Sequence, residues 1–105
     1  IPNASMIGSQ APVSMADDAV IKVIDAQAGA AMVYVYDSTS GGGGVFFVTY
    51  TDNAVKVAGS SNTAATDNDG NLCVYKSTSD HDVYVKNRLG ATRSISITIV
   101  SALAA

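Results

Sequence analysis

The residues of this chain most able to do chemistry are a histidine between two aspartates, Asp80-His81-Asp82, and a second acidic group, Asp67-Asn68-Asp69. A metal needs ligands that converge on one point, but neighbouring residues on a tight turn point in different directions. The second group resembles the start of a calcium loop, yet Leu72 and Thr78 stand where that loop needs Gly and Glu. We predict no required metal, leaving open a weak Ca²⁺ site at Asp67 and Asp69.

Motifs typical of enzymes are also missing. A hydrolytic triad pairs its histidine with a positioned nucleophile, and no nucleophile-elbow motif accompanies His81. The glycine run Gly41–Gly44 differs from a phosphate-binding loop, because it leads into Val45-Phe46-Phe47 and not into Gly-Lys-Ser/Thr and a helix. We therefore predict that the chain is not an enzyme, has no catalytic residues and binds no cofactor, and that 38–44 is a loop or turn.

Aromatic side chains are the best candidates for binding a partner. Tyrosines on the surface of a sheet can stack on sugars or anchor a subunit interface, and they can also be half-buried strand residues with only the hydroxyl in water. We keep all of these interpretations open. The candidates for interface or glycan contacts are Tyr34, Tyr36, Tyr50, Tyr75 and Tyr84.

Period-2 alternation predicts the elements that position these residues. It is clearest from Gly70 to Ile99, where three alternating runs with short breaks predict adjacent strands in an antiparallel meander. All nine acidic residues are Asp, which favours turns over helices. We predict an all-β fold, an antiparallel β-sandwich (jelly-roll-like or Ig-like) of about seven strands. Its predicted core includes Val55, Val57, Leu72, Val74, Val83, Val85, Ile95, Ile97 and Ile99.

The 105 residues predict one sandwich domain, 19–105, preceded by an extended arm, 1–18. The arm shows neither helical nor strand periodicity, because Pro2, Gly8 and Pro12 interrupt it. Its isolated apolar residues suggest an extended segment that lies along a neighbouring subunit, although a loose terminus is an equal alternative. The assembly residues of this arm would be Ile7, Val13 and Met15.

Composition indicates which partners to expect. Hydrophobic residues make up 48% of the chain and charged residues 14%, so we expect part of the surface to be covered by other copies or by another structural protein. A net charge of −3 and only six scattered basic residues argue against nucleic acid. No apolar run reaches the roughly 18 residues of a membrane span. Cys73 is the one cysteine, which favours folding in a reducing cytoplasm.

The segments 69–76 and 82–90, with the turn Lys86-Asn-Arg-Leu-Gly90, resemble small β-sandwich modules of tailed-bacteriophage particles, such as capsid decoration and fibre-associated proteins. This resemblance implies a non-enzymatic, multimeric virion protein that folds in the host cytoplasm. The alternative from another class is an extracellular carbohydrate-binding module that uses exposed tyrosines and the loop 59–71.

Overall fold

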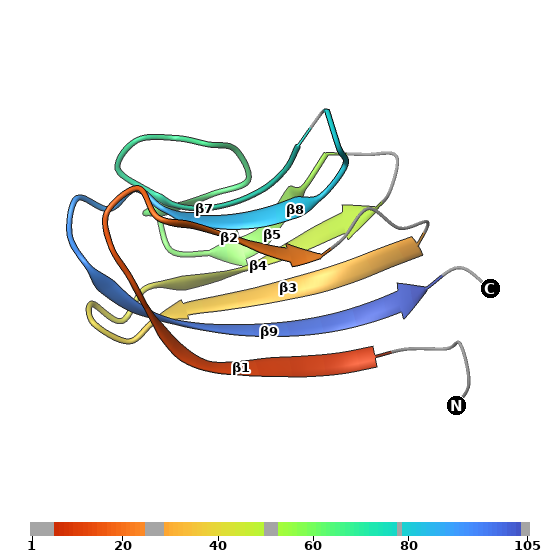
Figure 1. The fold of residues 1–105 in the computed structure, drawn as a ribbon, viewed down its shortest axis with the longest axis horizontal. Helices are drawn as coiled ribbons and strands as arrows, with labels where there is room; N and C mark the ends of the chain where they lie inside the picture. Colours follow the sequence, from red (N-terminus) through yellow and green to blue (C-terminus); the bar gives the residue numbers. More distant parts are fainter. Residues whose placement is uncertain (1–5, 25–28, 50–52, 78, 104–105) are drawn as a thin grey trace.

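The computed structural model describes residues 6–24, 29–49, 53–77 and 79–103, which form nine strands in two sheets and no helix (Figure 1). The five-stranded sheet has the order β1 (Met6–Met15), β9 (Arg93–Leu103), β3 (Gly29–Asp37), β4 (Gly43–Thr49) and β5 (Val55–Gly59). The four-stranded sheet has the order β2 (Val20–Ile24), β8 (Val83–Asn87), β7 (Leu72–Lys76) and β6 (Thr63–Ala64). All described pairs are antiparallel except β6 with β7.

The two sheets lie face to face with the hydrophobic core between them, so the prediction of an all-β, sandwich-like chain is confirmed. In Figure 1, β1, β9 and β3 run side by side along the lower part of the molecule, and β2, β8 and β7 lie above them. About seven strands were expected; β1 and the two-residue β6 are additional. The long connection after β5 crosses to the other sheet, where β6 begins.

Alternate residues of β4 and β8 supply the core, as the period-2 pattern requires, whereas three consecutive residues of β7 are buried. Phe46, Val33 and Ile95 of the five-stranded sheet and Val74 and Val85 of the four-stranded sheet are fully enclosed. Ile99 is half-buried and packs against this core. The predicted core residues that are buried are Leu72, Val74, Val83, Val85, Ile95 and Ile97.

Two predicted core residues are wrong. Val55 and Val57 are 55% and 56% exposed. The residue between them, Lys56, is half-buried, and its Nζ donates hydrogen bonds to the carbonyl oxygens of Ser60 (2.8 Å) and Thr63 (3.0 Å). Alternation identifies two sides of a strand but not which side is inward, and here the loop carbonyls hold the lysine on the inner side.

The prediction of a three-stranded meander is wrong for its third strand. β7 and β8 pair antiparallel as expected, with Tyr75 opposite Tyr84. β9 lies instead in the other sheet, between β1 and β3. Residues 88–92 therefore form a connection between sheets and not a hairpin turn within one sheet.

The segment predicted as an arm is, over Met6–Met15, an edge strand of the chain's own sheet. β1 pairs with β9 from Met6 opposite Ser101 to Met15 opposite Arg93, with a register shift between Gln10 and Val13. Met15 is 2% exposed and Val13 packs against the core; Ile7 lies opposite Val100 in the ladder. The sequence does not reveal this strand because its hydrogen-bond partner lies far along the chain. Contact of these residues with another subunit stays a prediction.

The glycine run is only partly the loop that was predicted. Gly41 has a φ of +86° and makes the turn, whereas Gly43 and Gly44 already belong to β4, opposite Tyr36 and Val35. A Cβ at Gly43 would lie 2.6 Å from the carbonyl oxygen of Val35, closer than real Cβ atoms approach backbone. Glycine is thus needed inside this strand for close approach, a requirement that composition alone does not show.

Candidate functional site

The candidate site is the outer surface of β9, β3, β4 and β5, which we call the uncharged face. Its side chains form rows across the sheet. Tyr34 lies opposite Val45 on one side and Thr98 on the other, and the next row places Tyr36 between Gly43 and Ser96. A third row joins Phe47, Met32 and Val100. At the edge, β5 adds Val55 opposite Phe47 and Ala58 opposite Val45.

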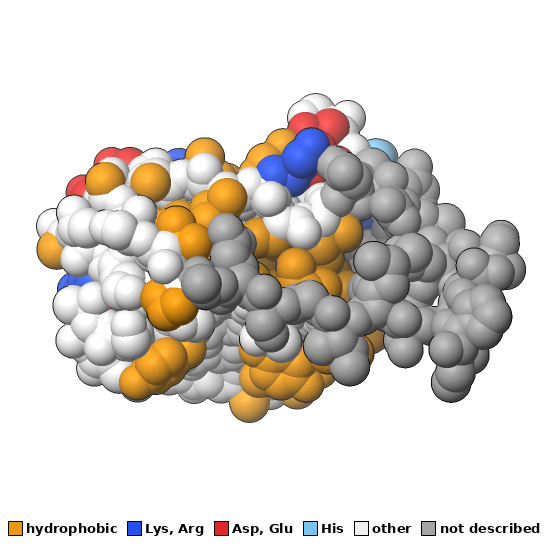
Figure 2. Space-filling view, turned by 60° about the horizontal axis from the view of Figure 1, so that its bottom comes forward, with side chains coloured by type: hydrophobic (Ala, Val, Ile, Leu, Met, Phe, Trp, Pro, Cys, Tyr) orange, Lys and Arg blue, Asp and Glu red, His pale blue; other side chains and the backbone are white. Residues whose placement is uncertain are grey.

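Large hydrophobic side chains on this face are open to solvent. Tyr34, Tyr36 and Phe47 are 41%, 50% and 40% exposed. They are outward because the alternate residues of the same strands, among them Val33 and Phe46, fill the core. In the space-filling view of Figure 2, hydrophobic side chains gather in patches across the middle, and charged side chains lie towards the margins. An exposed apolar surface of this kind marks an interaction site.

No charged side chain points outward from the described part of the five-stranded sheet. Its charged residues there are Asp37, Lys56 and Arg93. Asp37 is 1% exposed, and its Oδ2 lies 3.0 Å from Nη1 of Arg93. Burial alone would raise the pKa of Asp37, but hydrogen bonds from Ser40 and from the backbone of Thr39, together with Arg93, hold it below the ordinary value of 3.8. The charges of this sheet are thus turned inward.

The opposite side of the molecule carries an ion-pair network instead. Arg88 lies 3.1 Å from Asp67, 3.5 Å from Asp18 and 3.8 Å from Asp69, and Lys86 lies 3.2 Å from Asp67. Burial would raise the pKa of Asp67, but its hydrogen bonds with Lys86 and Arg88 lower it. The carboxylates suggested for Ca²⁺ are therefore already neutralised by two cationic side chains, an arrangement that disfavours a cation there.

The two aspartates that flank His81 already make local contacts. Asp80 accepts hydrogen bonds of 3.0 Å from the backbone N–H of Asp82 and from the hydroxyl of Tyr84, and these lower its pKa. Asp82 lies 3.8 Å from Lys22. His81 is the turn residue, with a φ of +62°. Across the described ranges, no three His, Cys, Asp or Glu side chains come close enough to hold a metal.

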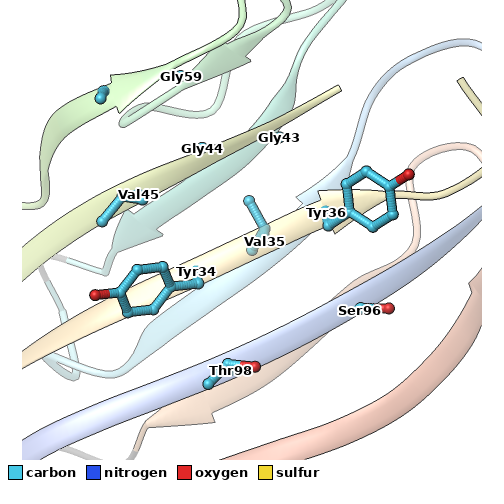
Figure 3. A pocket seen from close by; sticks show the side chains of 10 residues that line it. Tyr34, Val35, Tyr36, Gly43, Gly44, Val45, Gly59, Ser96 and Thr98 are labelled. Carbon is cyan, nitrogen blue, oxygen red and sulfur yellow. The ribbon is translucent and has the colours of Figure 1, made fainter. Parts of the chain in front are cut away.

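A shallow hollow of about 440 Å³ lies on the uncharged face, beside its two tyrosines. Figure 3 shows the rings of Tyr34 and Tyr36 along β3, with Ser96 and Thr98 on β9 to one side and β4 to the other. The hollow exists because Gly43, opposite Tyr36, has no side chain to fill it. It offers apolar rings beside hydroxyl groups.

The structure separates the five candidate tyrosines. Tyr34 and Tyr36 share the uncharged face, whereas Tyr75 and Tyr84 lie on the four-stranded sheet with ring centroids 5.8 Å apart. Tyr50 lies outside the described residues. Sequence reasoning did not single out Phe47 or Val55 as members of the face. The signal that could have found Phe47 is the apolar character of both alternating sets in 31–37 and 45–49. No such signal marks Val55, because Lys56 beside it is polar.

Comparison of the chain with protein-family models, with curated proteins and with solved structures finds no match. Among the residues that the structure describes, no helix is long and apolar enough to cross a membrane.

Proposed function

We propose that this chain is a non-enzymatic structural subunit of a multimeric assembly, and that a second copy covers the uncharged face. The observation that carries this proposal is the exposure of Tyr34, Tyr36 and Phe47 on a sheet surface whose described residues present no outward charge. Association of two such faces removes apolar area from water without removing a charged group from it.

A second copy is the favoured occupant because the described part of the face carries no charge that a second copy would repel. Two copies related by a two-fold axis bring the same surface together, and a face without charge meets no like-charge repulsion. The charged side chains of the other sheet, such as Arg88 and Asp67, then stay in water. Four strands about 4.8 Å apart and about seven residues long cover roughly 450 Å² in projection, and protruding rings enlarge this towards the roughly 800 Å² per partner of a standard interface.

The assembly that we propose is a bacteriophage virion, in which the chain is a capsid decoration protein or a tail or fibre component. Support comes from the resemblance of 69–90 to phage sandwich modules and from the two-layer, mostly antiparallel architecture. The finer fold assignment, jelly-roll-like or Ig-like, belongs to the same proposal. Another structural protein of the particle is then a further partner. Folding in the host cytoplasm agrees with Cys73, which is 0% exposed with a pKa that burial raises, as expected of an unreactive thiol.

A second candidate function, an extracellular carbohydrate-binding module, is favoured by the hollow on the same face. Tyr34 and Tyr36 supply ring surfaces there, and Ser96 and Thr98 supply hydroxyls at matching positions of the next strand. The two candidate functions use the same side chains, but one predicts that a second copy covers this face and the other that a saccharide binds there.

The experiment that separates them is sedimentation velocity of the chain with and without a panel of saccharides, read beside a glycan array. A structural subunit is expected to sediment as a multimer whose mass does not change with saccharide and that binds no glycan on the array. A monomer with saccharide-dependent shifts that Tyr34→Ala abolishes would contradict the structural assignment and support the alternative.

A further inference from the structure

The strand β1 and the next strand along the chain belong to different sheets. β1 joins the five-stranded sheet through its ladder with β9, whereas the next strand, β2, pairs with β8 in the other sheet. Residues 16–19 alone connect the two strands. β1 and β2 are not paired with each other, so β1 can leave its own chain if the link 16–19 opens and its ladder with β9 forms in another copy.

The link is tightly folded in a conformation that an extended chain would release. Asp18 has a φ of +66°, in the left-handed region that is uncommon for residues other than glycine. The backbone N–H of Ala19 donates to the carbonyl oxygen of Ala16 at 3.0 Å, and that of Asp18 donates to Asn87. If the link opens, the bond from Ala19 to Ala16 breaks and Asp18 can leave the left-handed region.

The site that receives β1 is built from the rest of the fold. β9 presents the hydrogen-bonding edge, the core encloses Met15, which is 2% exposed, and the side-chain amide of Asn87 donates to the carbonyl oxygen of Met15 at 2.8 Å. Every copy of the chain carries this site. A β1 strand from a second copy would find the same contacts there.

From these observations we infer that β1 is exchanged between two copies of this chain, each strand completing the five-stranded sheet of the other. The exchanged pair keeps the β1–β9 ladder and the enclosure of Met15, and differs from the closed monomer in the link 16–19. A short link under backbone strain favours exchange, because the open form relieves the strain and the contacts of β1 are regained in the partner. The cost of opening is the hydrogen bonds of the link, such as that from Ala19 to Ala16.

This inference rests on the proposed function only in requiring a second copy. It uses the β1–β9 ladder and not the uncharged face. The two can therefore fail separately, and a pair joined by exchange still leaves the uncharged face available for further assembly.

The test introduces one cysteine into each of two variants of the full chain, which also keep Cys73. Ser14 and Ser94 lie directly opposite each other in the β1–β9 ladder. We would refold a mixture of two differently tagged variants, Ser14→Cys and Ser94→Cys, oxidise it, and look for a covalent heterodimer on a non-reducing gel. The control is the unmodified chain, whose Cys73 is enclosed.

The expected result is a disulfide-linked heterodimer of the two tagged variants, with a yield well above that of either homodimer. A multimer that forms without this heterodimer, while the double variant Ser14→Cys/Ser94→Cys closes its disulfide within one chain, would overturn the exchange and leave the proposed function standing. Absence of any multimer would overturn both.

The link provides a second test. Asp18→Gly removes the penalty of the left-handed conformation, so the closed monomer becomes more stable relative to the exchanged pair. The heterodimer yield is expected to fall at least about fivefold. Asp18→Asn is the matched control, since asparagine tolerates the same conformation while losing the charge that faces Arg88. An equal loss of yield in both variants would show that the ion pair, and not the backbone, governs the link and would contradict the exchange mechanism.

Discussion

The side-chain amide of Asn87 donates a hydrogen bond of 2.8 Å to the carbonyl oxygen of Met15, a residue 72 positions earlier in the chain. Asn87 is 0% exposed, and its Nδ2 also donates to the carbonyl oxygens of Ala16 (3.3 Å) and Ala91 (2.9 Å). These bonds hold together the end of β1 and the connection from β8 to β9, two of the places where the chain changes sheets.

Replacing Asn87 by alanine is expected to lower the free energy of unfolding by about 2 to 4 kcal/mol, because buried carbonyl groups lose their donor and the side-chain volume is lost. Urea unfolding at neutral pH measures this change. Asn71→Ala is the matched control, since the amide of Asn71 makes a 3.4 Å bond at the surface. A loss below about 0.5 kcal/mol for Asn87→Ala would mean that the junction does not depend on this side chain.

Adjacent phenylalanines on β4 test the orientation of the five-stranded sheet. Phe46 is 0% exposed and Phe47 is 40% exposed. Phe46→Ala is expected to lower the free energy of unfolding by about 3 to 5 kcal/mol, whereas Phe47→Ala in dilute, dissociated protein changes it by less than about 1 kcal/mol. Chemical denaturation of both variants at one concentration decides this. The reverse ranking would show that the opposite side of β4 is the core side.

The buried carboxylate Asp37 is expected to make the fold sensitive to acid. Its folded-state pKa is held below 3.8, so its stabilisation is fully present above that value. As the pH falls through 3.8, the unfolded chain takes up a proton first, and the stabilisation is lost until the pH passes below the lowered pKa. Asp37→Asn should therefore be less stable at pH 7 by about 1 to 3 kcal/mol and should show a shallower loss between roughly pH 5 and pH 2.

The comparison variant for this pH profile is Asp67→Asn. The pKa of Asp67 is lowered as well, but its side chain is 40% exposed, so solvent screens its ion pairs. Asp67→Asn should therefore change the pH dependence of the unfolding free energy less than Asp37→Asn does. A larger effect at Asp67 would mean that the surface network, and not the Asp37–Arg93 pair, sets the acid stability.

Local alternation was enough to predict the strand class and most of the buried residues. Val83 and Val85 lie on β8, where Tyr84 and Lys86 mark the wet side. Leu72 and Val74 on β7 are buried as well, although Cys73 between them is also buried. The pattern failed at β5, where the polar residue Lys56 lies on the inner side and the apolar residues lie on the outer side. Val55 and Val57 are exposed because β5 lies at an edge of a sheet whose outer surface is itself apolar.

Sheet membership could not be predicted from the same pattern. The strand β9 follows β8 after a short connection, yet it pairs with β1 and β3, because neither the short break nor the alternation records which sheet a strand enters. The uncharged face was foreseen only as scattered tyrosines. Its continuity depends on cross-strand neighbours such as Tyr34 and Thr98, which lie far apart in the sequence.

The measurement that tests the central claim most directly is the solution mass, by sedimentation velocity, of Phe47→Lys beside Val20→Lys. Phe47 lies on the uncharged face, whereas Val20, 51% exposed, lies on β2 of the other sheet and serves as the matched site. Far-ultraviolet circular dichroism first establishes that both variants are folded. A lysine at position 47 places an unpaired charge in the interface, so association should weaken at least about 100-fold and the mass should fall below that of the unmodified chain, while Val20→Lys keeps the full mass. An unmodified chain that is monomeric, or a Phe47→Lys variant that keeps the full mass, would contradict assembly through this face.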